Sequence, residues 1–287
     1  MIPPAFAYQA PTTLPEAIAL LSANPGEAKI LAGGHSLLPM MKLRFAQPGQ
    51  LIDLNRIDQL RGIREVAGEI RIGAMTTESQ LIGSPLLRDK LPLLAEVARQ
   101  IGDPQVRNRG TIGGDLAHGD PANDHPAIAI ALDATLVVEG PRGQRLVKVE
   151  DFFHGLYMTD LAENEILTEI RIAPFPAGTG WAYEKLKRKT GDWATAAAAV
   201  VMRMDSGKVS AIRIALTNVA ATPQRAVAAE QALLGRFLTS DSLGDAMHAV
   251  QSVCAPAEDL RGDVTYKTSM AGEMVRRAVE RAAVRCI

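Results

Sequence analysis

Hydrophobic and polar positions repeat with two different periods along this chain, and the changes of period delimit its predicted elements. A helical period over residues 13–26 predicts a first helix, with Thr13 as N-cap and Glu16 in capping-box spacing, ended by Pro25-Gly26. A longer helical segment over residues 84–103 is interrupted near Pro92. Apolar runs or alternations predict strands over residues 28–34, 50–57, 69–76 and 165–174, and a hairpin over residues 135–149.

Towards the C-terminus the pattern changes to strands followed by helices. Strands are predicted over residues 181–189, 196–204 and 208–219. Thr222 and Pro223 favour the start of a helix, because a cap residue is followed by proline. The final helix is predicted over residues 268–286. One face of this helix is predicted to pack in the core, and it carries Met270, Met274, Ala278 and Ala282.

Two segments break the periodic pattern. Residues 106–126 are rich in Gly, Asp and Asn and are predicted to form a long loop, a feature that is often functional inside a compact domain. Residues 174–180, PFPAGTG, predict a linker and place a domain boundary there. The expected domains are 1–176, with lobes of about 1–55 and 56–176, and 177–287. Strands segregated from helices favour an α+β fold over a doubly wound sheet.

Composition and charge exclude several classes of function. The chain has 287 residues, of which 47% are hydrophobic. Its net charge is −1, so its overall charge does not attract nucleic acid or a membrane surface. Two cysteines cannot hold an iron–sulfur cluster, and they fit a cytoplasmic location with reduced thiols. We expect neither a signal peptide nor a membrane-spanning helix. The basic run 185–189 lacks aromatic neighbours, which disfavours nucleic-acid binding.

Two glycine pairs are the strongest local signal. Gly33-Gly34 and Gly113-Gly114 each follow a short apolar run and lie close to a hydroxyl, that of Ser36 or Thr111. Glycine permits close backbone approach, and successive N–H groups can form an anion-binding concavity. Two such loops could hold a diphosphate from two sides. Neither loop is a GxGxxG or a GxxxxGK[ST] motif, and spacing alone leaves plain turns as an equal alternative.

Five stretches together carry a family resemblance. AGGHS (32–36), TIGGD (111–115) and residues 42–57, 184–201 and 215–220 resemble the FAD-carrying medium subunits of molybdenum hydroxylases. The resemblance covers essentially the whole chain and is greatest to the branch found in aerobic, molybdenum- and copper-containing carbon monoxide dehydrogenases. It implies a two-lobed FAD-binding domain of the vanillyl-alcohol-oxidase (PCMH) type. A smaller α+β C-terminal domain, with an antiparallel sheet plus helices, would follow.

The resemblance also implies which residues contact the diphosphate and flavin side of FAD. From the first motif these are Ala32, Gly33, Gly34, His35, Ser36 and Leu37, and from the second Thr111, Ile112, Gly113, Gly114 and Asp115. Many relatives carry Asn at the last position of the second motif. A carboxylate there would repel phosphates, so we expect Asp115 to face the flavin or ribityl hydroxyls, or to lie one step away. His35 is the variant associated with the carbon monoxide branch.

Three further positions match the family, and each has an alternative interpretation. Asp124 is expected near the ribityl or ribose hydroxyls, or as the N-cap of a helix beginning near Pro126. Lys185 is expected at the polar edge of the flavin, where a positive charge stabilises its anionic reduced form, or on a solvated basic face. Trp193 is expected over one face of the isoalloxazine, or as a buried structural tryptophan.

By the same resemblance, the chain would be one electron-carrying subunit of a larger complex. A large partner would hold the molybdenum cofactor with copper, and a small partner two [2Fe-2S] clusters, in a dimer of heterotrimers. Electrons would pass through the clusters to FAD and on to an external acceptor, for example a quinone, which allows peripheral association with the cytoplasmic membrane. The chain itself would contain no carbon-monoxide-oxidising residue and no metal.

Several alternatives remain open at this stage. The whole complex could hydroxylate a heteroaromatic substrate instead. The chain could be a stand-alone flavin oxidase, although no clear catalytic base stands out, or a non-redox nucleotide-binding scaffold. His118, His125, Asp120 and Asp124 superficially resemble metal ligands, but their spacing fits no zinc signature.

Overall fold

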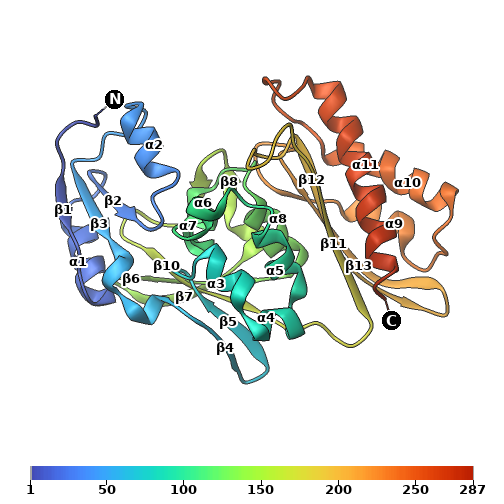
Figure 1. Ribbon diagram of the computed structural model, residues 1–287, viewed down its shortest axis with the longest axis horizontal. Coiled ribbons are helices and arrows are strands. Elements are labelled where there is room, and N and C mark those ends of the chain that lie inside the picture. The colour runs from blue at the N-terminus through green and yellow to red at the C-terminus, as the bar shows by residue number, and fades with distance from the viewer. Residues whose placement is uncertain (1, 287) are drawn as a thin grey trace.

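The computed structural model describes residues 2–286. Its first lobe is a three-stranded parallel sheet in the order β1-β3-β2, formed by β1 (Ala7–Gln9), β2 (Ala28–Leu31) and β3 (Gln50–Asp53). Helices α1 (Leu14–Ala23) and α2 (Leu37–Lys42) complete the lobe (Figure 1). The predicted start of the first helix is confirmed, because the Thr13 side chain accepts a hydrogen bond from the Glu16 N–H at 3.4 Å.

The second lobe is built on a five-stranded antiparallel sheet in the order β4-β5-β10-β6-β7. Its strands are β4 (Ile63–Val66), β5 (Glu69–Gly73), β6 (Thr135–Gly140), β7 (Gly143–Lys148) and β10 (Ile166–Ile172). Between β5 and β6 lie α3 (Glu78–Gly83), α4 (Pro85–Lys90), α5 (Pro92–Ala98), α6 (Pro104–Arg107), α7 (Ile112–His118) and α8 (Asp124–Ala131). A small hairpin, β8 (Phe153–Gly155) and β9 (Met158–Thr159), precedes β10. Short 3₁₀ turns occupy Leu54–Arg56, Asp58–Leu60, Val149–Asp151 and Gln251–Val253.

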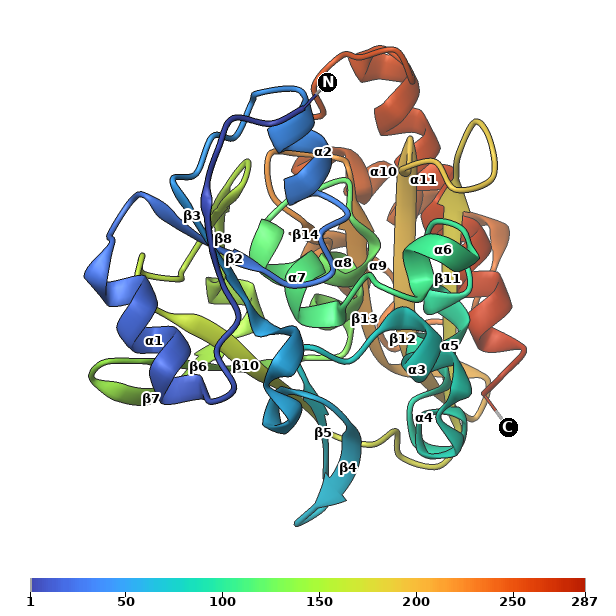
Figure 2. The same cartoon turned by 60° about the vertical axis from the view of Figure 1, so that its left-hand side comes forward.

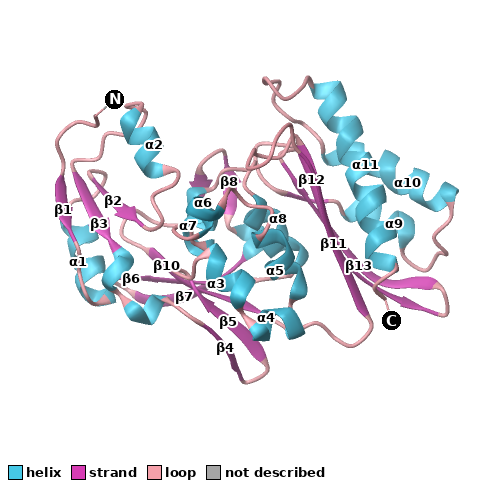
Figure 3. Ribbon diagram, in the orientation of Figure 1, coloured by secondary structure: helices cyan, strands magenta, loops and turns pink. Residues whose placement is uncertain are grey.

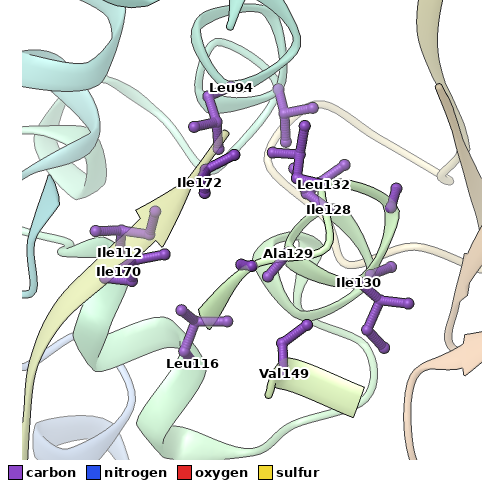
Figure 4. Packing of buried hydrophobic residues seen from close by; sticks show 14 of the residues in the cluster. Leu94, Ile112, Leu116, Ile128, Ala129, Ile130, Leu132, Val149, Ile170 and Ile172 are labelled. Atoms are coloured by element: carbon purple, nitrogen blue, oxygen red, sulfur yellow. The ribbon is translucent and has the colours of Figure 1, made fainter. Parts of the chain in front are cut away.

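A single apolar core joins the helices of this lobe to its sheet. Leu94 of α5, Ile112 of α7 and Ile128 of α8 pack against Ile170 and Ile172 of β10, and all five side chains are buried (Figure 4). The helix interruption predicted near Pro92 is confirmed, since α4 ends at Lys90 and α5 begins at the proline. These contacts place α7, which carries the second glycine pair, on a rigid support.

The C-terminal domain is a four-stranded antiparallel sheet in the order β11-β12-β13-β14. It comprises β11 (Thr179–Leu186), β12 (Ala196–Asp205), β13 (Lys208–Thr217) and β14 (Gln224–Arg225), followed by α9 (Val227–Leu233), α10 (Ser240–Val250) and α11 (Val264–Ala283). Figure 3 shows these helices on the outer face of the sheet, away from the first two lobes. The α+β fold class with a two-lobed first domain is therefore confirmed.

The alanine run of β12 is explained by burial on both faces. Ala197 and Ala199 belong to the core shared with the second lobe, whereas Ala196 and Ala198 face the core formed with the C-terminal helices. Successive strand residues point to opposite faces, so a strand buried on both sides is continuously apolar. The predicted core stripe of the last helix is confirmed at Met274, Ala278 and Ala282, with Met270 partly buried beside them.

Two element predictions are wrong. Residues 106–126 contain helix α7, which begins immediately after Thr111 because this threonine caps it, so the segment is not one long loop. Thr222 and Pro223 do not start a helix: Arg225 pairs with Ala215 as strand β14, and its guanidinium binds Glu230, so α9 begins only at Val227. Tertiary pairing overrides the local cap signal at this position.

In the part of the chain that the structure describes, we find no helix with the length and apolar character needed to cross a membrane.

We expect Gly180→Ala to destabilise the protein by about 1–3 kcal/mol, as overpacking does. A Cβ at Gly180 of β11 would collide with the carbonyl oxygen of Ala282 and lie 2.7 Å from the Cys286 sulfur. Gly244 of α10 has open space and serves as the matched control, since Gly244→Ala should stabilise its helix by about 0.5–1 kcal/mol. Urea unfolding of both variants gives the two values, and equal effects would contradict this packing.

Candidate functional site

The first glycine pair forms an open main-chain loop between β2 and α2. Gly34 has φ +78°, a left-handed conformation that favours glycine. Within residues 2–286, the N–H groups of Gly33, Gly34, His35 and Ser36 donate to no protein acceptor. The Ser36 hydroxyl does not cap α2, and the His35 ring bonds the Gly33 carbonyl oxygen at 3.1 Å. This loop therefore presents four consecutive unused donors and a hydroxyl.

The second glycine pair lies in the first turn of α7, and its N–H groups are already used. The Ile112 N–H donates to Thr76 O at 3.1 Å, and the Gly113 N–H donates to Ala74 O at 2.9 Å. The Gly114 N–H donates to the Thr111 hydroxyl oxygen at 3.2 Å. Asp115 N–H completes the turn by donating to Thr111 O at 3.0 Å. These four N–H groups therefore all have protein acceptors, unlike those of the first loop.

Close packing explains why both residues of the second pair are glycines. A Cβ at Gly113 would lie 2.7 Å from the Ala74 Cα, closer than real side chains allow. A Cβ at Gly114 would lie 3.2 Å from the Ala32 Cβ and 2.8 Å from the Thr111 hydroxyl oxygen. Glycine at these positions lets α7 approach both the end of β5 and the first loop.

The two motifs meet in space although they are far apart in the sequence. A Cβ at Gly33 would collide with Arg109 O and lie 2.8 Å from Gly110 Cα, just before the second motif. The Asn55 side chain donates to Ala32 O at 3.0 Å and accepts from Arg61 at 3.1 Å, which ties the first loop to the second lobe. Figure 2 shows the end of β2 beside α7. One continuous region therefore contains both motifs.

A buried ionic cluster lies behind the second motif. The His125 ring binds both carboxylate oxygens of Glu78, at 2.9 and 3.0 Å, and both side chains are almost fully buried. The main-chain N–H of His125 donates to an Asp115 carboxylate oxygen at 3.2 Å. Asp115 therefore lies one step from the glycines, turned towards α8.

This cluster shifts the pKa of two groups. Burial raises the pKa of Asp115 to about 7, and the charges of Glu78 and Asp124 act in the same direction while His125 opposes them. Burial disfavours a charged His125, but the charge and hydrogen bonds of Glu78, with Asp115 and Asp124, raise its pKa to about 9. A protonated His125 and a partly protonated Asp115 are therefore expected near neutral pH.

Asp124 and Lys185 form a buried ion pair between the second lobe and β11. The Lys185 ammonium donates to an Asp124 carboxylate oxygen at 2.7 Å, and only 2% of the lysine side chain is exposed. The hydroxyl of Tyr183 donates to the other carboxylate oxygen. The solvated-face interpretation of Lys185 is therefore wrong. So is the N-cap interpretation of Asp124, since Asn123 holds that position and Asp124 is the first helical residue.

Trp193 is half exposed, so the interpretation of a buried structural tryptophan is wrong. Its indole N–H donates to the Asn123 side-chain oxygen at 3.3 Å. The guanidinium of Arg261 lies 5.7 Å from the ring centroid. Trp193 therefore presents a flat aromatic surface beside the second motif.

Five neighbours of the site were not identified from the sequence: Asn55, Glu78, Arg109, Asn123 and Tyr183. Each belongs to a strand, helix, cap or turn segment whose local pattern is ordinary. Glu78 follows the capping threonine Thr77, which resembles a routine helix start, and its partner His125 is remote in the sequence. Only the fold reveals such pairs.

We expect His125→Gln to lower the unfolding free energy by about 3–5 kcal/mol near neutral pH, because Glu78 is left buried without a partner. A raised His125 pKa stabilises the fold fully below its unfolded value of about 6.5. This contribution is lost as the pH rises through about 9. The difference in unfolding free energy between the wild type and His125→Gln should therefore become smaller above about pH 9. The double variant Glu78→Gln/His125→Gln should lose less than the two single variants together. A loss independent of pH, measured by urea unfolding, would contradict a charged pair.

Two family models match consecutive parts of this chain. Residues 4–175 match the family model described as the FAD binding domain in molybdopterin dehydrogenase. Residues 181–282 match that of the CO dehydrogenase flavoprotein C-terminal domain.

Two relatives and two solved structures illustrate the match. The chain is 61% identical over 286 residues to the carbon monoxide dehydrogenase medium chain of Hydrogenophaga pseudoflava, covering 100% of both chains. A solved carbon monoxide dehydrogenase from that organism, lacking the Mo-pyranopterin moiety, superposes with a TM-score of 0.99 at 63% identity and 100% coverage of both chains.

A solved Cu,Mo-CO dehydrogenase in its cyanide-inactivated form gives a TM-score of 0.98 at 50% identity, over 99% of this chain and 100% of that one. The nicotine 6-hydroxylase medium subunit of Paenarthrobacter nicotinovorans is 37% identical, over 98% of this chain and 99% of that protein. The chain thus belongs to the family of FAD-binding flavoprotein subunits of molybdenum hydroxylases.

Proposed function

We propose that this chain is the FAD-carrying electron-transfer subunit of an aerobic carbon monoxide dehydrogenase. The observation that carries the proposal is 61% identity to a carbon monoxide dehydrogenase medium chain over the full length of both proteins. In the complex a large partner holds the molybdenum cofactor with copper, and a small partner holds two [2Fe-2S] clusters. Carbon monoxide and water are converted to carbon dioxide on the large partner, not on this chain.

The first loop fits the diphosphate of FAD. A diphosphate needs several hydrogen-bond donors at close range, and the loop from Ala32 to Leu37 supplies unused N–H groups and the Ser36 hydroxyl. Glycine at position 33 lets this loop approach the chain at Gly110, and glycine at position 34 permits its left-handed turn. The second motif, Thr111 to Asp115, forms the opposite wall, and its carboxylate is turned towards His125 rather than towards the phosphates.

Residues from both domains are assigned to the flavin ring. FAD supplies the redox chemistry, taking electrons from iron–sulfur clusters and giving them to an acceptor such as a quinone. The half-exposed Trp193 covers one face of the isoalloxazine. Lys185 lies at the polar edge, and Asp124 neutralises part of its charge, which moderates its effect on a reduced flavin.

Apolar surface near the first loop supports permanent assembly. Leu38, Leu43 and Phe45, on α2 and just after it, are exposed by 39%, 55% and 79%. Interfaces of obligate complexes are large and apolar. We propose a dimer of heterotrimers in the cytoplasm, with peripheral attachment to the membrane through the electron acceptor.

A second candidate is a complex that hydroxylates a heteroaromatic compound. The full-length similarity to the nicotine 6-hydroxylase medium subunit favours it, since FAD subunits with different partners share this fold. The substrate is set by the large partner, so the two candidates differ in the chains that co-purify with this one.

We expect Gly33→Ala to reduce bound FAD at least tenfold, because the new Cβ collides with Arg109 O and separates the two motifs. Gly49→Ala is the matched control in the same lobe, where the nearest atom is 3.6 Å away, and it should retain FAD. Ser36→Ala should weaken binding without disturbing packing, by about 0.5–1.5 kcal/mol for one hydrogen bond. Flavin absorbance per chain measures all three, and full FAD content in Gly33→Ala would refute the site.

We expect the complex that co-purifies with this chain to lose its visible flavin absorbance when carbon monoxide is added without oxygen. The same sample with a heteroaromatic substrate should stay oxidised. Bleaching by nicotine-type compounds alone would select the second candidate. Turnover of an organic substrate by this chain without partners would indicate a stand-alone oxidase, and absence of flavin after FAD addition would indicate a non-redox scaffold.

A further inference from the structure

Asn123 connects the second glycine motif to Trp193 of the C-terminal domain. Its side-chain NH₂ donates to Asp115 O at 3.3 Å, and its side-chain oxygen accepts from the Trp193 indole N–H at 3.3 Å. A carbonyl oxygen needs a donor and an indole N–H needs an acceptor, so the two partners fix the orientation of this amide. Asn123 is only 9% exposed, and its single amide bridges two domains.

The position of Asn123 at the start of α8 does not explain the hydrogen bonds of its side chain. Asn123 is the N-cap of α8, where asparagine normally binds the N–H groups of the first turn. The Asn123 side chain makes no such capping bond. Both of its polar ends are instead used by Asp115 and Trp193. The bridge, and not the helix cap, therefore accounts for both polar ends of this side chain.

Trp193 is also held from its other side. An Asp192 carboxylate oxygen accepts from the Trp193 main-chain N–H at 2.9 Å and from the Arg261 guanidinium at 2.9 Å. That guanidinium lies over the indole ring. The ring is half exposed, yet its orientation is fixed by Asn123 on one side and by Arg261 on the other. A large exposed side chain without such anchors would populate several rotamers.

We propose that Asn123 is a positioning residue that orients the Trp193 indole relative to the second flavin motif. The inference rests on the proposed FAD site and deepens it. A ring that is already oriented loses little conformational freedom when the isoalloxazine packs against it, so binding is tighter. Asp115 O and the indole then move together, which couples the C-terminal domain to the lobe that forms the wall of the site.

A double-mutant cycle on the purified complex tests the bridge. FAD is removed, and the dissociation constant of added FAD is measured for Asn123→Ala, Trp193→Phe and the double variant. We expect each single change to weaken FAD about three- to tenfold, the range expected for one hydrogen bond. Phe keeps an aromatic ring but has no N–H, so Asn123→Ala should add little in that background.

Flavin fluorescence is a second measurement, and it would not change if Asn123 only stabilised the fold. A stacked indole quenches flavin emission, so Asn123→Ala should raise the emission of bound FAD, and Trp193→Phe should raise it further. In the Trp193→Phe background, Asn123→Ala should leave emission unchanged. Asn123→Asp, which keeps the acceptor for the indole, should retain most of the quenching even if Asn123→Ala folds poorly. Asn164→Ala, in the loop before β10, is the matched control and should behave as wild type.

The outcomes separate this inference from the proposed function. If the wild-type complex takes up no FAD, the FAD site itself is refuted. If it takes up FAD and Asn123→Ala has wild-type affinity and emission, only the positioning role is refuted. Additive effects in the cycle would also overturn it, because they would show that Asn123 acts independently of the indole.

Discussion

The direct backbone contact between Gly33 and the chain at Arg109 and Gly110 is the constraint on which the site depends. It leaves no space for a Cβ, so at this point the two lobes meet main chain against main chain. The Ala32 carbonyl accepts a hydrogen bond from Asn55, and the loop that follows has N–H groups without protein acceptors. Without this contact the two glycine motifs would belong to separate surfaces, and neither could enclose a dinucleotide.

The two motifs contribute differently to this arrangement. The first supplies donors, whereas the second supplies a tightly packed wall whose N–H groups are used by Ala74, Thr76 and Thr111. A carboxylate at Asp115 is tolerated because His125 lies behind it and Glu78 holds the histidine. The C-terminal domain completes the region through the Lys185–Asp124 ion pair and the Trp193–Asn123 hydrogen bond. Charges and hydrogen bonds buried at the domain boundary thus connect all three parts of the chain.

Sequence patterns predicted much of the fold and part of the site. The Thr13 cap, the break at Pro92 and the core stripe around Met274 are local features, and all three are confirmed. The helix within residues 106–126 was missed because its first turn contains Gly113-Gly114 and has little local propensity. It is held by the Thr111 cap and by packing on Ala74. The roles of Glu78, Asn123 and Tyr183 arise from partners remote in the sequence, so no local pattern could indicate them.

Amide hydrogen exchange, compared between the FAD-loaded and FAD-depleted complex, tests the central claim most directly. The N–H groups of residues 33–36 have no protein acceptor, so FAD should slow their exchange strongly. Residues 112–115 are already hydrogen-bonded and should be protected in both samples. New protection at 112–115 with none at 33–36 would contradict the account, because the diphosphate would then be held by the other motif.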